Sequence, residues 1–321
     1  MMMRRKLLLL SPVLLTLGCA DSSFVAGDAR ALDSGTGSGE NPFSQPDFRG
    51  EQVSYTCKDV VDIVFVLDVS SSMSFVLSTL EKEIGLVVDA ANKLAPDAHL
   101  GLIGYVDNYR LDTTGPLEGG KVHTAAATLQ KAFANYRTTY TDADRNPGDG
   151  PTGPTLQNPV CEENAVDSLV GAAEEFPWRA NATRVIIVAT DDTFLERPDN
   201  YGDRDGDGKT DKTDFPREGN YPAKSTMAEA IAAVKKVKAR VFSFTRLKDP
   251  GLFAPTRCGT PRRLPWSSIS DGWSTPYKGQ KPIPTETAGG NFDIDLVFGG
   301  KLSLTTTINN VVLESYCKPI E

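Results

Sequence analysis

The sequence predicts an α/β fold in which helices flank a doubly wound, mostly parallel central sheet. Two observations carry this prediction. Short apolar runs rich in β-branched residues recur along the chain, and such runs are typical of strands buried on both faces. Segments with apolar residues at helical spacing separate them, so strand and helix alternate. Ligands of such folds bind beyond the carboxyl ends of the strands, so polar residues there are the functional candidates.

The elements are expected in the following order. Residues 60–67 (VVDIVFVL) predict the first buried strand, and residues 72–94, apolar at every third or fourth position, predict a long helix. Further strands are expected at 99–106, 120–125 (a short edge strand), 184–190, 241–245 and 290–294, and further helices at 127–136, 163–176, 224–238 and about 302–316. The remaining long segments, about 107–119, 138–160, 192–223 and 247–284, are expected to be loops, and most of them directly follow a predicted strand.

Composition limits the classes of function. The chain has 321 residues, 40% of them hydrophobic, which is enough for a substantial buried core. Its formal net charge of −8 argues against nucleic acid as a partner, because phosphate backbones are bound by basic patches. Only two histidines are present, His99 and His123, which excludes a zinc site built from several histidines.

The N-terminal segment is expected to be a targeting signal. Basic residues at 4–6 precede an apolar run at 7–17 that is too short to span a bilayer. The run ends in LTLGC, which resembles the lipobox of bacterial lipoproteins. This resemblance implies a signal peptide at 1–18 and a lipid on Cys19 that anchors the chain in the bacterial cell envelope, in the outer membrane rather than the inner one. An ordinary secretory signal is the alternative.

Residues 19–55 are rich in Ser, Gly, Asp and Pro, so we expect a flexible tether that leads to one domain at 56–321. Four cysteines remain beyond Cys19, an even number that favours disulfide bonds in an exported protein, and they allow three pairings. Cys57 precedes the first strand and Cys317 follows the last helix, so a Cys57–Cys317 bridge would join the ends of the domain. Cys161–Cys258 would then form by elimination.

Residues able to bind a metal follow two of the predicted strands. Asp68, Ser70 and Ser72 follow the first, and Asp191 follows the strand at 184–190. Because parallel strands end at the same edge of a sheet, both carboxylates can reach one point. Carboxylate and hydroxyl oxygens suit Mg²⁺, Mn²⁺ or Ca²⁺. The alternative for the serine-rich turn is a simple cap of the following helix.

These motifs, Asp-x-Ser-x-Ser and Thr-Asp, resemble the metal-ion-dependent adhesion site of the von Willebrand factor A (vWA) domain family. Residues 286–294 (ETAGGNFDI) are similar to the family's approach to its final strand. The resemblance covers about 58–316 and implies a vWA, Rossmann-like fold with long insertions on the metal-site face. Carried over by position, the implied ligands are Asp68, Ser70, Ser72 and Asp191, with Thr155 as the family's threonine before a middle helix. Asp192 stands where the family has glycine.

The resemblance also implies a function. Hydroxyls, water and one or two carboxylates leave a divalent ion with residual positive charge, so an acidic residue of a protein partner can complete its coordination shell. We therefore expect a lipid-anchored envelope protein that binds a partner through Mg²⁺ (or Mn²⁺ or Ca²⁺), in adhesion or in assembly of an envelope complex. An enzyme is not expected, since no activated nucleophile or general base accompanies the motifs. The alternative is a calcium-stabilised envelope scaffold without metal-mediated binding.

A second metal site is predicted in an insertion at about 199–223. Residues 203–214 (DRDGDGKTDKTD) place oxygen-bearing side chains at the spacing of a calcium loop, with Gly208 at the sharp turn. The segment resembles EF-hand and thrombospondin type 3 calcium loops, and Ca²⁺ there would order the loop beside the first site. A solvated acidic loop is the alternative. The implied ligands are the side chains of Asp203, Asp205, Asp207, Asp211 and Asp214 and the carbonyl of Lys209.

Overall fold

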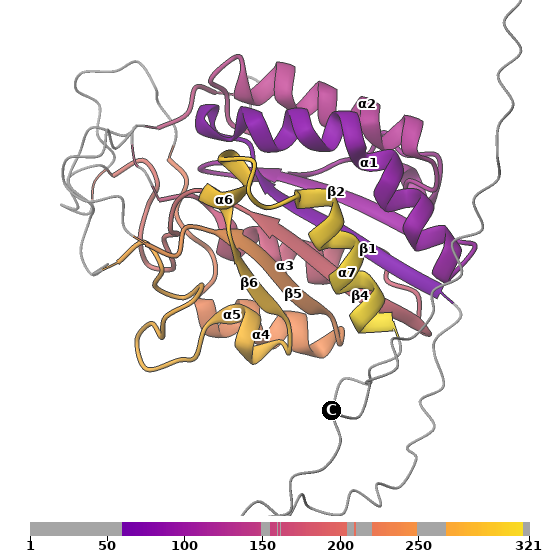
Figure 1. Cartoon of the computed structure of the whole chain (residues 1–321). Helices are drawn as coiled ribbons and strands as arrows, with labels where there is room; N and C mark the ends of the chain where they lie inside the picture. Colours follow the sequence, from indigo (N-terminus) through magenta and orange to yellow (C-terminus); the bar gives the residue numbers. More distant parts are fainter. Residues whose placement is uncertain are drawn as a thin grey trace, which may run out of the picture. The chain divides into compact units, whose positions relative to one another are not determined.

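The described residues form a central sheet of six strands (Figure 1). In chain order the strands are β1 (Val60–Asp68), β2 (His99–Tyr105), β3 (Tyr109–Leu111), β4 (Ala182–Ala189), β5 (Arg240–Thr245) and β6 (Gly290–Asp293). Their spatial order is β3-β2-β1-β4-β5-β6, and all neighbours are parallel except β2 and β3. This arrangement confirms the predicted doubly wound, mostly parallel sheet.

This computed structural model describes residues 60–148, 155–158, 160, 162–203, 209, 220–248 and 268–316, all within the unit Val53–Glu321. The predicted signal peptide, Cys19 and the tether lie outside these residues, as do Cys57, Cys161, Cys258 and Cys317, so these remain predictions. Within the described part, no helix combines the length and the hydropathy needed to cross a bilayer.

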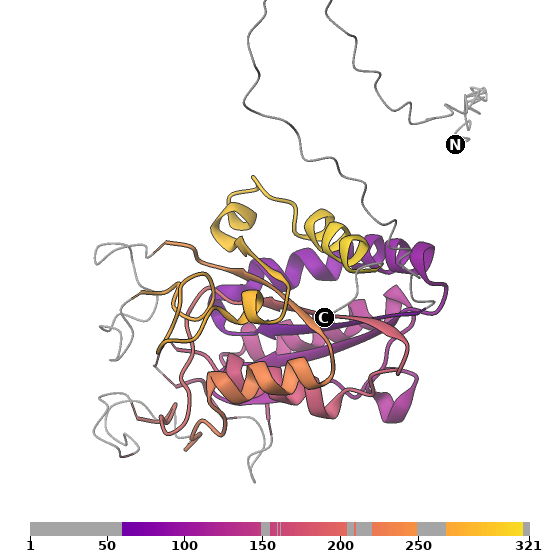
Figure 2. The same cartoon turned by 90° about the horizontal axis from the view of Figure 1, so that it is seen from below.

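Helices cover both faces of the sheet, and Figure 2 shows α1 and α7 on one side and α4 on the other. Alternate residues of β1 explain the two layers, because Ile63 and Phe65 pack on one face while Val64 and Val66 pack on the other, all fully buried. The first layer holds α1 (Ser74–Leu94), α2 (Ala126–Tyr136) and α7 (Leu304–Tyr316), and the second holds α3 (Ala165–Glu175) and α4 (Met227–Lys236). Shorter elements are η1 (Ser71–Met73), η2 (Glu118–Gly120), η3 (Arg137–Thr141), α5 (Ile283–Glu286) and α6 (Ile294–Phe298).

The edge strand differs from the prediction. Residues 120–125 make isolated bridges, Val122 with Leu117 and His123 with Leu100, rather than a strand. The strand at this edge is β3, in a segment predicted to be loop, and it pairs antiparallel with β2. Three residues are too few to show a strand period, so hydrophobic patterning could not detect it.

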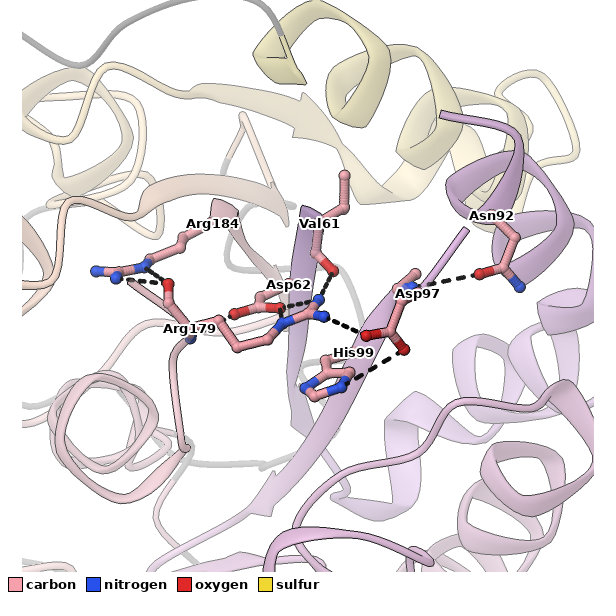
Figure 3. A network of polar contacts seen from close by, with 8 residues as sticks. Val61, Asp62, Asn92, Asp97, His99, Arg179 and Arg184 are labelled. Atoms are coloured by element: carbon pink, nitrogen blue, oxygen red, sulfur yellow. Dashed lines mark hydrogen bonds and ion pairs between the residues drawn. The ribbon is translucent and has the colours of Figure 1, made fainter. Parts of the chain in front are cut away.

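At the amino ends of the strands, a polar network surrounds Asp62 of β1, which is fully buried (Figure 3). Arg179, between α3 and β4, donates its backbone N–H to Asp62 Oδ2 at 2.8 Å and its Nε–H to Asp62 Oδ1 at 2.7 Å. The same guanidinium donates to Asp97 Oδ2 and to the Val61 carbonyl, each at 2.9 Å. The buried carboxylate is therefore both paired and hydrogen-bonded, which is the condition for a buried charge to be tolerated.

Candidate metal site

Neighbouring parallel strands bring the predicted site residues to one edge of the sheet. Asp68 is the last residue of β1, and Asp191 follows β4, which pairs with β1 so that Leu67 lies opposite Ala189. After Asp68 the chain turns directly into η1 and α1, so Ser70 and Ser72 lie on the turn above the sheet. The fold therefore places the carboxylates and hydroxyls of the two motifs together.

A chain of hydrogen bonds joins these residues. The Ser70 N–H donates to Asp68 Oδ1 at 2.7 Å, and the Ser72 hydroxyl donates to Asp191 Oδ1 at 2.8 Å. The hydroxyls of Ser70 and Ser72 share a hydrogen bond of 2.9 Å. Because Ser72 uses its only proton on Asp191, Ser70 is the donor of that bond. The structure thus brings together all of the predicted adhesion-site residues except Thr155.

The Asp68 carboxylate is fully buried, and its second oxygen accepts a hydrogen bond of 2.9 Å from the Thr190 hydroxyl. Burial, followed by the nearby Asp191 carboxylate, raises the pKa of Asp68 to about 7. Among the described residues no basic side chain forms an ion pair with Asp68. A cation at this position would offset both causes, since it would neutralise the buried charge and screen the repulsion between the carboxylates.

Asp191 has a positive partner that the sequence reasoning missed. Arg246 Nη2 lies 3.3 Å from Asp191 Oδ2, and its Nε donates to Asp295 Oδ1 at 3.2 Å. Arg246 directly follows β5, the strand next to β4, so it reaches the same edge as Asp191. Its position immediately after a predicted strand was the signal that could have identified it.

Thr155 makes its contacts elsewhere. Its hydroxyl is hydrogen-bonded to the hydroxyl of Tyr221, and its carbonyl accepts from the Asn146 N–H at 2.7 Å. The predicted helix start at 163 was two residues early, because α3 begins at Ala165. The prediction of Thr155 rested on its place before this helix, and that place alone does not show which residue of the preceding loop faces the site.

Glu163 is the side chain before α3 that belongs to this region, although we had not predicted it as a site residue. Its N–H donates to the Thr193 carbonyl at 2.9 Å, which joins it to the loop after β4. Glu163 is buried, and its Oε2 has no hydrogen-bond partner in the described part of the chain. Burial, together with the carboxylates of Asp68 and Asp107, raises its pKa well above the usual range. Glu163 thus adds acidic character beside the two motifs.

Asp192 stands where the vWA family has glycine, and its carboxylate contacts the backbone of the next residue. Its Oδ1 accepts the Thr193 N–H at 2.8 Å, and the residue is half-buried. This contact shapes the turn after Asp191.

The predicted calcium loop lies mostly outside the described residues. Of its ligands only Asp203 and Lys209 are described; Asp203 is buried and Lys209 is exposed. The positions of Asp205, Asp207, Asp211 and Asp214 are not described, so this loop remains a prediction.

In the described ranges, no three side chains drawn from His, Cys, Asp and Glu lie close enough to hold a metal ion. The site built on Asp68 and Asp191 has two carboxylates, and its other protein ligands would be the hydroxyls of Ser70 and Ser72. That donor set fits a hard cation that keeps part of its water shell, such as Mg²⁺, Mn²⁺ or Ca²⁺.

No protein-family model matches the chain, and no curated protein is similar to it in sequence. Among solved structures it is similar to the conserved hypothetical protein BatB from Bacteroides thetaiotaomicron, with 13% identity and a TM-score of 0.40 over 79% of this chain and 98% of that one. It is also similar to proximal thread matrix protein 1 from the mussel byssus, with 16% identity and a TM-score of 0.40 over 83% of this chain and 48% of that one. Likenesses this distant carry no weight for function. The strand order and the helix layers themselves establish a doubly wound, Rossmann-like α/β fold.

Proposed function

We propose that this protein binds a divalent cation at Asp68, Ser70, Ser72 and Asp191 and, through that ion, an acidic side chain of a protein partner. The observation that carries the proposal is the hydrogen-bonded chain from Asp68 through the two serines to Asp191. It gathers two carboxylates and two hydroxyls at the strand ends, where ligands of this fold class bind.

The electrostatics support a cation. Asp68 is fully buried beside a second carboxylate, and its contacts within the described residues are hydrogen-bond donors, Ser70 and Thr190. A bound divalent ion would supply the positive charge that Asp68 otherwise lacks. When bound, the ion supplies an electrophilic centre with exchangeable positions; the residues hold and orient it.

The partner's chemistry follows from incomplete neutralisation. Two carboxylates, of which Asp191 is also paired with Arg246, and two neutral hydroxyls leave a doubly charged ion with residual positive charge. A carboxylate offered by a partner would complete its shell, whereas a lysine-rich surface would be repelled. We propose no catalytic step, because the site gathers no activated nucleophile or general base among the described residues.

We place this function in a vWA-like domain tethered by lipid on Cys19 to the bacterial outer membrane, with Ca²⁺ at 203–214 ordering an adjacent loop. These elements rest on the lipobox, the Asp-x-Ser-x-Ser motif and the spacing of the acidic loop. Adhesion and assembly of an envelope complex are the two roles such a protein would serve.

The Arg246–Asp191 ion pair favours a second candidate, a structural envelope scaffold. The Arg246 guanidinium already neutralises the charge of Asp191. In this alternative the site never binds a metal ion, and the domain serves only as a scaffold.

Calorimetric titration of the full chain with Mn²⁺ separates the two candidates. The wild type should bind one Mn²⁺ more than Asp68→Ala, which should keep its circular dichroism spectrum. Asp142→Asn, a change at a more exposed carboxylate that pairs with Arg137, is the matched control and should bind like the wild type. Partner capture from envelope extract should disappear in Asp68→Ala and in chelator. Capture that persists in both would refute the adhesive function.

A further inference from the structure

Arg246 lies between two carboxylates that come from different elements. Asp191 follows β4, Asp295 is in α6 after β6, and Arg246 follows β5, the strand between them. The guanidinium contacts both, at 3.3 Å to Asp191 Oδ2 and 3.2 Å to Asp295 Oδ1. Its side chain is 22% exposed, so it lies at the rim of the site.

Arg246 can form an ion pair with both carboxylates or with Asp295 alone. Asp191 Oδ1 already accepts from the Ser72 hydroxyl, so the guanidinium and a bound ion would compete for the charge of one carboxylate. The ion brings two positive charges next to a fixed one, and the repulsion weakens its binding. If Arg246 turns away from Asp191 it remains paired with Asp295 and is not left as an isolated charge.

An arginine released from Asp191 in this way would regain the N–H donors that it had used on that carboxylate, at the rim of the site. A guanidinium carries five N–H groups in a planar fork that matches a carboxylate, which lysine cannot reproduce. A carboxylate arriving at the ion could therefore contact both the ion and Arg246. Arg246 would therefore weaken binding of the ion alone and strengthen binding of the ion together with an acidic ligand.

Building on the proposed function, we propose that Arg246 is the residue that makes cation binding depend on an acidic partner. It weakens the site for the ion alone by pairing with Asp191, and it serves as a second anchor for the partner's carboxylate. By thermodynamic reciprocity, the ion must then tighten binding of the carboxylate by the same factor that the carboxylate tightens binding of the ion.

Mn²⁺ titrations of the full chain, with and without an excess of N-acetyl-aspartate amide, test this proposal. N-acetyl-asparagine amide, which has the same shape without the charge, is the control probe. In the wild type the aspartate probe should lower the Kd for Mn²⁺ by about tenfold, within the usual range of coupling between two ligands. The asparagine probe should leave it unchanged.

Two substitutions isolate the arginine. Arg246→Ala should bind Mn²⁺ alone about tenfold more tightly than the wild type and respond to the aspartate probe by less than about twofold. Arg246→Lys keeps the charge without the planar fork, so it should bind Mn²⁺ weakly and lose most of the response to the probe. Lys235→Ala, which breaks the ion pair with Glu286 on α5, is the matched control and should behave as the wild type.

Unchanged or weaker Mn²⁺ binding in Arg246→Ala would overturn the inference, as would a probe response as large as that of the wild type. Failure of the proposed function looks different, because then the wild type and Arg246→Ala would both bind no more Mn²⁺ than Asp68→Ala.

Discussion

A fully buried aspartate lies toward each end of β1, and the two carboxylates have opposite electrostatic surroundings. Asp62, at the amino end, has an arginine and a backbone N–H on its carboxylate. Asp68, at the carboxyl end, has a second carboxylate nearby and a pKa raised to about 7 by burial and by Asp191. At the amino end the buried carboxylate is paired with an arginine, whereas the carboxyl end holds two nearby carboxylates, which is the arrangement that the proposed cation would neutralise.

The largest expected loss of stability comes from removing the arginine that pairs with Asp62. Arg179→Ala would leave Asp62 buried without its ion pair, and removal of one member of a buried pair costs about 3–5 kcal/mol. Urea denaturation measures the loss. Arg197→Ala, which breaks an exposed pair with Glu229, should cost no more than about 1 kcal/mol. Equal losses in the two variants would show that the amino-end network does not stabilise the fold in the way described.

The second prediction tests the carboxyl end directly. Mn²⁺ at about one hundred times its Kd should stabilise the wild type by about 2.7 kcal/mol, because the ion binds only the folded chain. Asp68→Asn keeps the size of the side chain and removes its charge, so Mn²⁺ should raise its unfolding midpoint by less than that of the wild type. Thermal unfolding with Mn²⁺ or chelator gives both values. A matching Mn²⁺ shift in Asp68→Asn would show that the ion binds at another position.

Asp112 is a third buried carboxylate, and its contacts come from neither the Asp62 network nor the Asp68 site. Asp112 accepts from His123 at 2.9 Å and from the Thr114 N–H at 3.0 Å. Burial acts to raise the pKa of Asp112, but the bonds from His123 and Thr114 outweigh it, and the pKa falls below its ordinary value of 3.8. A depressed pKa contributes stability that is present above the ordinary value and is lost as pH falls through the lower folded value.

Asp112→Asn should therefore lose about 1.5–3 kcal/mol of stability at pH 7, the size of a hydrogen bond to a charged group. It should also show a smaller loss of stability than the wild type when the pH is lowered below about 4. Urea midpoints across this pH range provide the measurement. The same acid-side slope in both proteins would contradict the assignment.

The smallest changes in Mn²⁺ affinity are expected from substitutions of Glu163 and Thr155. Glu163→Gln replaces a buried carboxyl group whose raised pKa already favours its neutral form, so little charge is lost and Mn²⁺ affinity should fall by less than about tenfold, or about 1.4 kcal/mol. Thr155→Val should leave the affinity unchanged, since its hydroxyl contacts Tyr221. Calorimetry of both variants provides the comparison. A larger loss in Thr155→Val than in Glu163→Gln would restore the original ligand prediction.

The sequence was most informative where a local pattern and the topology act together. Asp68 and Asp191 could be paired because each directly follows an apolar run, and parallel strands end at one edge. The edge strand was missed because Tyr109–Leu111 is too short to show periodicity. The contact of Thr155 with Tyr221 could not be predicted, because it joins segments far apart in the chain and no local spacing encodes it. Arg246 was detectable in principle, since it follows a strand as Asp191 does.

The straight run of β1 between its two aspartates has a wider consequence. A strand rises about 3.3 Å per residue, so the carboxylates of Asp62 and Asp68 are separated by about 20 Å. At about 20 Å two unit charges interact by less than about 1 kcal/mol at an effective dielectric constant of about 20, so the coupling between the two buried aspartates is weak. A substitution at one end of β1 should therefore leave the ionisation of the aspartate at the other end largely unchanged.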